Sequence, residues 1–267
     1  MTMIISDDAY DKRAPCVLFE NVLDYGAVSA STADAGYDVE NATSGTTWDA
    51  YKPVSATSAN YDVDAGVDVE CDCAFVDAHT LGSVGGSVRV WASTDGVGWT
   101  PITDAVDVAD NGAVMLIWRG VEYRYWRIAF THDAAPEIGV LSIGKRLVFP
   151  NGIATPHTSI QHSKKIEVLG GDSDSGQFTG QMIVRKSASV NVTFPLLDAD
   201  WVENEMKPFE THYNEAKPFA WAASPLFDGD DMGYCQRPSG AGELSPSYYE
   251  GGMYEEFTMR LGVYVNV

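Results

Sequence analysis

The chain has 267 residues and carries 38 Asp and Glu side chains against 17 Lys and Arg, a formal net charge of -21. Hydrophobic residues make up 45% and aromatic residues 11% of it, which is typical of a globular protein and not of a disordered one. Nucleic acids and anionic lipid both require a basic surface, so the acidity argues against both partners.

Neither a membrane span nor a secretion signal is expected. The longest uncharged apolar run, residues 113–118, is far shorter than a bilayer-spanning helix. The opening segment, MTMIISDDAYDKR, carries acids early and has no apolar stretch, so we expect no signal peptide. The four cysteines are therefore expected to be reduced, as in a protein that folds in the cytoplasm.

Short segments of alternating apolar and polar residues dominate the first half of the chain. In residues 67–76 the apolar side chains, with Cys71 and Cys73 among them, alternate with acids and one alanine. This predicts a half-buried strand with both thiols on its core face, and it is favoured over a zinc site because zinc needs further ligands. Further strands are expected at residues 16–22, 87–93, 113–118, 123–131 and 138–149.

The turn Pro150-Asn151-Gly152 predicts a boundary between two domains, residues 1–150 and 151–267. Regular strands without intervening helices predict an all-β protein, with a jelly-roll sandwich followed by a second β-rich domain. In the second domain strands are expected at residues 163–169, 177–186, 187–194, 218–222 and 254–267, with a long loop over 228–249.

One helix is expected, near residues 200–215. Asp200 and Glu203 resemble a capping box at its start. Pro208 should kink or restart it, because proline cannot donate the backbone hydrogen bond. The side chains that follow at helical spacing and share one face are Val202, Met206, Phe209 and Tyr213.

No pattern of catalytic residues is present. The five histidines do not form a metalloprotease motif, and there is neither a nucleophile elbow nor a nucleotide-binding glycine pattern. Among so many acids a glycosidase pair stays an open alternative, although solvated surface carboxylates are the simpler interpretation. We therefore expect no enzyme, no catalytic residue and no cofactor. His79 is expected to be structural, because no partner motif accompanies it.

Two sets of residues have the chemistry of metal ligands. His157 and His162 can share a metal through a turn, but polar linker histidines are the favoured interpretation. Five loop aspartates offer the hard oxygen ligands of Ca²⁺, yet they lack the spacing of a calcium-binding loop, so no metal site is expected. These are Asp172, Asp174, Asp228, Asp230 and Asp231.

Loop aromatics are the candidate binding residues. Trp48, Tyr51, Trp99 and Trp118 lie in or near expected loops of the first domain. Sugar-binding sites combine exposed aromatic side chains with a few polar groups, so these four are the predicted carbohydrate-binding residues. The alternative is that each of them closes one end of the sandwich core, because large aromatics are mostly buried.

Several segments resemble a known family. Gly36-Tyr37, Glu40-Asn41-Ala42 and Thr47-Trp48 are similar to the opening of discoidin-like (coagulation factor 5/8 type C, galactose-binding-like) jelly rolls. Residues 64–102 resemble a variant of that fold in bacteriophage tail proteins, through HTLG at 79–82 and STDGVGW at 93–99. Thr80 stands where that family usually has Asn. Residues 177–221 resemble the C-terminal β-domain of the same tail proteins.

This resemblance implies a structural, non-enzymatic component of a phage tail tip or baseplate. The second domain would form a homo-oligomeric ring and contact other tail proteins (tail tube, hub and tail fibres), with the helix and the closing strand 254–267 as interfaces. The protein would be made in the host cytoplasm and reside in the virion. In distal tail proteins the ring-forming domain usually comes first, whereas here it comes last. The alternatives are a carbohydrate-binding adhesin that recognises a host surface glycan, and a glycoside hydrolase with a carbohydrate module.

Overall fold

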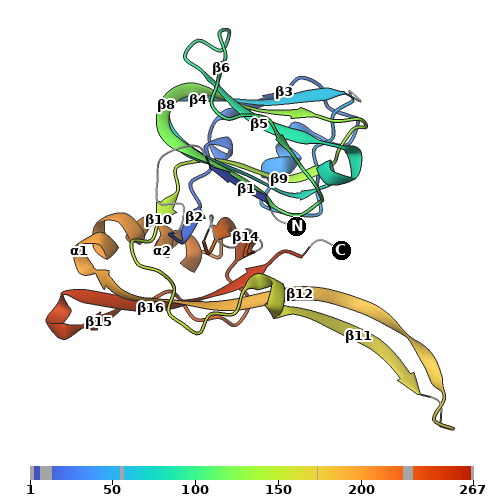
Figure 1. Ribbon diagram of the computed structural model, residues 1–267, viewed down its shortest axis with the longest axis vertical. Helices are drawn as coiled ribbons and strands as arrows, with labels where there is room; N and C mark the ends of the chain where they lie inside the picture. The colour runs from blue at the N-terminus through green and yellow to red at the C-terminus, as the bar shows by residue number, and fades with distance from the viewer. Residues whose placement is uncertain (1–2, 7–13, 55–56, 173, 225–230, 266–267) are drawn as a thin grey trace.

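The computed structural model describes the chain except residues 1–2, 7–13, 55–56, 173, 225–230 and 266–267. It consists of two eight-stranded sheets, of which the first folds into a sandwich and the second lies beneath it with a helical segment against it (Figure 1). This confirms the expected all-β class with one short helix. Short 3-10 turns occupy Val22–Asp24, Val39–Thr43, Leu81–Val84, Ile160–Ser163 and Glu250–Gly252.

The sandwich is built around two long strands that run through both of its layers. The order is β3-β4-β8-β5-β6, with β9 on β4, β1 on β8 and β7 on β5. One half of the β4–β8 pair joins β3 and β5 in an outer layer, and the other half joins β9 and β1 in an inner layer. The strands are β1 Met3–Ser6, β3 Ala27–Ala30, β4 Ser58–His79, β5 Ser87–Ser93, β6 Thr100–Pro101, β7 Val106–Asp107, β8 Val114–Thr131 and β9 Ile138–Gly144.

Two register shifts in the β4–β8 pairing, at Asp64/Val69 and Cys71/Cys73, mark the passage between the layers. Irregular pairing bends and twists a strand locally, which lets one strand serve both layers. The two strands expected at 113–118 and 123–131 are therefore one strand, β8. Val67, expected on the core face, lies at the first shift and is exposed.

The second sheet has the order β10-β2-β13-β14-β16-β12-β11, with β15 on β16. The expected strands 177–186 and 187–194 are one strand, and the expected loop 228–249 contains two strands, β14 and β15. The strands are β2 Cys16–Leu18, β10 Leu147–Val148, β11 Lys164–Asp172, β12 Phe178–Asp198, β13 Phe219–Ala222, β14 Met232–Gln236, β15 Ser247–Tyr249 and β16 Tyr254–Val263.

The helical segment comprises α1 Ala199–Trp201, a π-helical turn Val202–Met206 and α2 Lys207–Asn214. Its cap is Asp198, whose side chain accepts the backbone N–H of Trp201, and not the expected Asp200. Pro208 lies in the first turn of α2, so the helix restarts there as predicted. The predicted apolar face is confirmed, because Val202, Met206, Phe209 and Tyr213 are all buried.

One strand belongs to a different sheet from the one expected. β2, expected to open the jelly roll, pairs with β13 and β10 and belongs to the second sheet. Alternation shows that a segment is a strand but does not show which distant strand it pairs with. β16 is an internal strand of this sheet, with β12 on one side and β14 and β15 on the other, and its place at a subunit interface stays a prediction.

The inner layer is buried on both faces. One face packs into the sandwich core, and the other packs against β2, β13 and β14. Cys71 lies in the sandwich core and Cys73 in this seam between the sheets, so the thiols are buried as predicted but not on one shared face. The apolar residues of the seam include Phe75, Met115 and Ile117 from the sandwich and Leu18, Ala220 and Ala222 from the second sheet.

Candidate functional site

A hollow of about 380 Å³ opens on the solvent face of the outer layer. We call it the tryptophan hollow; the residues that give it its character are Asn60, Arg89, Trp91, Trp99, Arg127 and Ala129. They come from β4, β5, β8 and the turn between β5 and β6.

Strand alternation places these side chains on the solvent face. In β5, Val88, Val90 and Ala92 are buried in the sandwich core, so Arg89 and Trp91 point outward. In β8 the buried residues are Trp126, Ile128 and Phe130, which turns Arg127 and Ala129 outward. Asn60 lies between buried Ala59 and Tyr61 of β4.

The strand register sets these residues in two rows across the sheet. Ala129 of β8 stands between Asn60 of β4 and Arg89 of β5. In the next row Arg127 stands between Asp62 and Trp91. Because alanine is small and its neighbours in these rows are long, the floor of the hollow lies at Ala129.

Trp99 is held at the edge of the hollow by a hydrogen-bonded turn. Asp95 Oδ1 accepts the backbone N–H groups of Val97 and Gly98, each at 2.8 Å, and the Ser93 hydroxyl at 3.0 Å. These bonds lower the pKa of Asp95, and the bond from Gly98 has the largest effect. Gly96 has a φ of 74°, a left-handed conformation that glycine adopts without strain.

Both arginines stack on a tryptophan ring. The Arg127 guanidinium lies 3.9 Å from the centroid of Trp99, and Arg89 lies 4.3 Å from that of Trp91. Arg127 also donates two hydrogen bonds to the carboxylate of Asp62, at 2.6 and 2.7 Å. Stacking and the paired bonds fix these side chains, so the hollow is pre-organised.

The four predicted aromatics lie in different environments. Trp99 lines the hollow, whereas Trp48 is 80% exposed and is not among the residues that line it. Tyr51 and Trp118 are buried, which corrects their assignment as binding residues. Their polar atoms donate to backbone carbonyls, Tyr51 Oη to Thr32 and Trp118 Nε1 to Cys71, so both side chains can be core residues.

Asn60, Arg89, Trp91 and Arg127 were not among the binding residues predicted from the sequence. The signal was available, since the segment SVRVWAS alternates strictly and sets Arg89 and Trp91 on the face opposite the valines. What alternation does not show is that the turn at 93–99 brings Trp99 to the same face.

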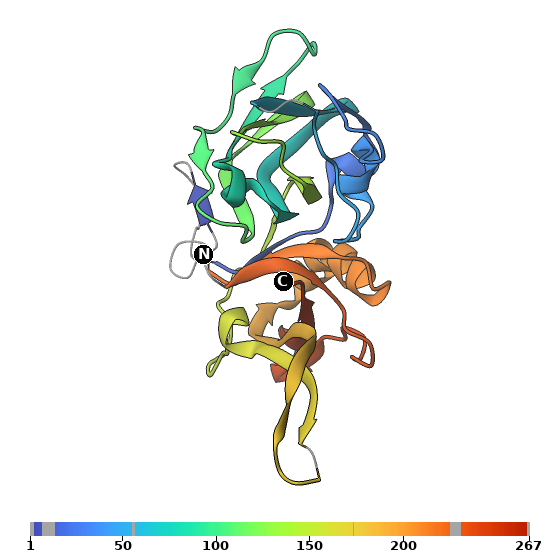
Figure 2. The ribbon, with the colours of Figure 1, turned by 90° about the vertical axis from the view of Figure 1, so that its right-hand side faces the viewer.

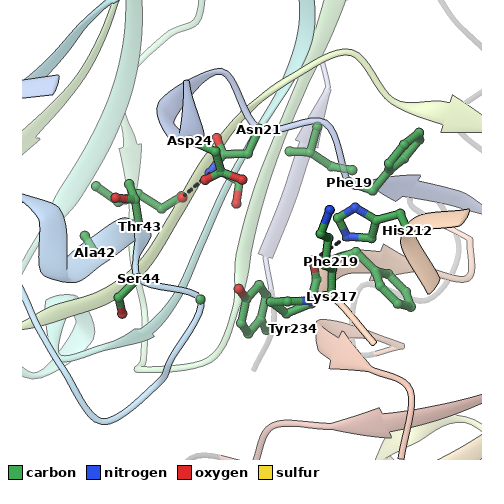
Figure 3. Close-up of a pocket in the computed structure, with 15 residues that line it drawn as sticks. Phe19, Asn21, Asp24, Ala42, Thr43, Ser44, His212, Lys217, Phe219 and Tyr234 are labelled. Atoms are coloured by element: carbon green, nitrogen blue, oxygen red, sulfur yellow. Dashed lines mark hydrogen bonds between the residues drawn. The ribbon is translucent and has the colours of Figure 1, made fainter. Parts of the chain in front are cut away.

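A second cleft, of about 250 Å³, lies at the junction of the sandwich and the second sheet (Figure 3). Its polar groups already bond within the chain. The Asn21 amide donates to Asp24 and to the carbonyl of Leu141, and His212 donates to the carbonyl of Pro218. Lys217 forms an ion pair with Glu215. These bonds already engage polar groups of the cleft, which leaves fewer of them for a ligand.

Two of the residues weighed as metal ligands, His157 and Asp231, contact each other. His157 Nε2 lies 2.7 Å from Asp231 Oδ2, and Asp231 also accepts the backbone N–H of Ile160. Asp228 and Asp230 lie outside the described residues. Within the described part of the chain there is no cluster of three or more potential metal ligands, and none of its helices is long and apolar enough to span a membrane. His79 is buried and accepts the N–H of Leu81, and burial lowers its pKa to about 4.

Comparison with known proteins gives fold likenesses only. No protein-family model matches the chain, and no curated protein matches it. Among solved structures, a fucosidase of glycoside hydrolase family 29 from Ruminococcus gnavus is 13% identical at a TM-score of 0.43, covering 49% of this chain and 28% of its own. A pectin-binding carbohydrate-binding module is 17% identical at 0.39, covering 44% and 88%.

Chitosan-binding module 1 of a chitosanase/glucanase from Paenibacillus sp. IK-5 is 15% identical at a TM-score of 0.39, covering 46% of this chain and 98% of its own. Each likeness extends over less than half of this chain, and the chain spans only about a quarter of the fucosidase. None of these three structures is a phage tail protein.

Proposed function

We propose that the protein is a non-enzymatic carbohydrate-binding protein whose site is the tryptophan hollow. One observation carries the proposal: two partly exposed tryptophans and two arginines converge on a single open hollow of a rigid sheet. Tryptophan rings stack on the C–H faces of pyranose rings, and fixed polar groups beside them select the hydroxyl pattern.

The polar groups supply both donors and acceptors. The guanidiniums of Arg89 and Arg127 donate to sugar hydroxyls or to the carboxylate of an acidic sugar, and the amide of Asn60 both donates and accepts. The arginines are held before the ligand arrives, so binding costs little side-chain entropy. The acidic body of the chain disfavours nucleic acid as the stacking partner.

The test is binding of the purified chain to a glycan array, followed by titration calorimetry with the glycans that bind. Trp91→Ala and Trp99→Ala are expected to abolish binding, and Ala129→Leu to do so by filling the floor while leaving both tryptophans in place. Trp48→Ala is the matched control, since it removes an exposed tryptophan outside the hollow. Loss of binding in Trp48→Ala alone, or no binding to any glycan, contradicts the proposal.

A place for this protein in a phage tail tip stays a prediction from the sequence resemblance. Glycan binding fits that setting as the adhesin role, in which the sandwich is displayed to a host surface. Electron microscopy of virions labelled with an antibody against the chain tests it, and absence of the protein from purified particles contradicts it.

A further inference from the structure

A long hairpin projects from the second sheet, at the opposite end of the molecule from the β5–β6 hairpin (Figures 1 and 2). It consists of β11 and the first part of β12, residues 164–187, and we call it the arm. Beyond residue 187, β12 enters the body, where it pairs with β16 from Ala188 onward. Within the described residues of the arm, β11 and β12 pair only with each other.

The core face of the sheet continues along the arm without cover. Paired residues of antiparallel strands point to the same side, and Lys164 pairs with Ala188, which is buried in the core of the second sheet. Two positions further on along β11, Ile166 lies on that same side, and so does Val168 with its partner Ile183. These three side chains are 57%, 50% and 52% exposed.

The arm is unusually apolar for an exposed ribbon. An isolated two-stranded hairpin is marginally stable in water, and contiguous exposed apolar side chains mark interaction sites. The edge of β11 is also the free edge of the sheet, so it can pair with a further strand. The large apolar side chains of the arm that are at least half exposed are Ile166, Val168, Leu169, Phe178, Met182, Ile183 and Val184.

The distribution of charged side chains on the arm indicates the kind of partner that would bind its apolar face. The base of the arm carries four of the chain's 17 basic side chains, Lys164, Lys165, Arg185 and Lys186, with Glu167 as the one acid among them. The chain as a whole has 38 acids. A basic patch at the root of an apolar arm is therefore complementary to the acidic surface of another copy of the same chain.

We propose that the arm binds a second copy of this chain, with its core-side apolar face against the neighbour and its basic base against the neighbour's acidic surface. This contact places self-association on the arm and not on β16 or the helix, the interfaces expected from the sequence. It is independent of the tryptophan hollow.

The test is the mass of the full chain in solution, measured by light scattering and sedimentation velocity over a range of concentrations. We expect a discrete multiple of 28.9 kDa. The triple variant Ile166→Ser/Val168→Ser/Ile183→Ser should raise the dissociation constant roughly tenfold or more, because apolar burial drives association. Lys164→Glu/Lys186→Glu should weaken it too, because both side chains lie on the core-side face, and added salt should weaken the wild-type assembly.

Val97→Ser is the matched control, since this valine is 83% exposed and belongs to the turn between β5 and β6, at the opposite end of the molecule from the arm (Figures 1 and 2). Circular dichroism and glycan binding should be unchanged in the arm variants, which separates this proposal from the proposed function. A single-chain mass at every concentration, open-ended aggregation, or a discrete oligomer that the arm variants leave intact would each overturn it.

Discussion

The guanidinium of Arg127 lies 3.9 Å from the ring of Trp99, a tryptophan contributed by a turn and not by the sheet itself. Arg127 is in turn held by Asp62 on the neighbouring strand. Trp99, the loop aromatic of the hollow, thus contacts an ion pair within the sheet, which makes that pair part of the proposed binding site.

Replacement of Arg127 should weaken glycan binding more than it weakens the fold. Arg127→Gln removes the stacking and the paired bonds to Asp62, and we expect affinity to fall about tenfold because Trp99 is no longer held in place before the ligand binds. Titration calorimetry measures it. Arg124→Gln is the control, because Arg124 makes the same type of contacts, to Asp64 and Tyr125, and does not line the hollow. Equal losses in both variants contradict the prediction.

The turn that carries Trp99 should weaken in acid. Hydrogen bonds from Gly98, Val97 and Ser93 lower the pKa of Asp95, so the folded state favours the carboxylate. The contribution of the Asp95 carboxylate to the free energy of unfolding is then present above the ordinary aspartate pKa and is lost as pH falls through the lowered pKa. We expect Asp95→Ala to reduce both glycan affinity and the free energy of unfolding at neutral pH, and to differ less from wild type in acid.

Urea unfolding at several pH values measures this difference. Asp104→Ala, an exposed aspartate that follows β6, is the control and should behave as wild type does. A constant difference between Asp95→Ala and wild type at all pH values would show that the carboxylate charge is not what holds the turn.

Much of the fold could be predicted because alternation reports which residues face a core. It located most strands and the helix face of Val202, Met206, Phe209 and Tyr213. It did not show that β2 joins a strand 200 residues away, because pairing partners of strands leave no local signal. Nor did alternation show that Cys71 faces the sandwich core and Cys73 the seam, since the register shift between them depends on the partner strand β8.

The site could be predicted only in part. Trp99, predicted as one of four loop aromatics, lines the hollow, and Trp91 was overlooked although its alternation was plain. Tyr51 and Trp118 were assigned wrongly because burial of an aromatic with a polar atom depends on a distant carbonyl, that of Thr32 or Cys71, which only the folded chain brings near.

The seam between the two sheets should make the chain unfold as one unit. Phe75 is fully buried in the seam and stacks on Tyr234 of the second sheet, with ring centroids 6.4 Å apart. We expect one calorimetric transition for the wild type, whereas Phe75→Ala should cost about 3–5 kcal/mol and show two transitions. Phe130→Ala, which removes a ring from the sandwich core, should destabilise without that separation. A single transition in Phe75→Ala contradicts the coupling.

Asp77 should make the seam more stable in mild acid than at neutral pH. It is buried between the sheets, where its carboxylate accepts the backbone N–H groups of Ala78 at 2.7 Å and of Tyr234 at 3.0 Å. Burial raises its pKa from 3.8 to about 6, against the lowering effect of these two bonds. The folded chain therefore holds the proton of Asp77 more tightly than the unfolded chain does. The resulting contribution to the free energy of unfolding is fully present below the ordinary aspartate pKa and is lost as pH rises through about 6.

The size of this stability contribution follows from the pKa shift of Asp77 and is on the order of 3 kcal/mol between the low-pH and high-pH limits. Asp77→Asn keeps one oxygen acceptor and cannot ionise, so its free energy of unfolding should lack this component. In urea unfolding, the free energy of unfolding of the wild type should then fall relative to that of Asp77→Asn as pH rises from roughly 4 to 7. The other carboxylates act in both proteins and cancel in this difference. Parallel pH profiles of the two proteins would show that Asp77 is ionised throughout, and that the two backbone bonds outweigh its burial.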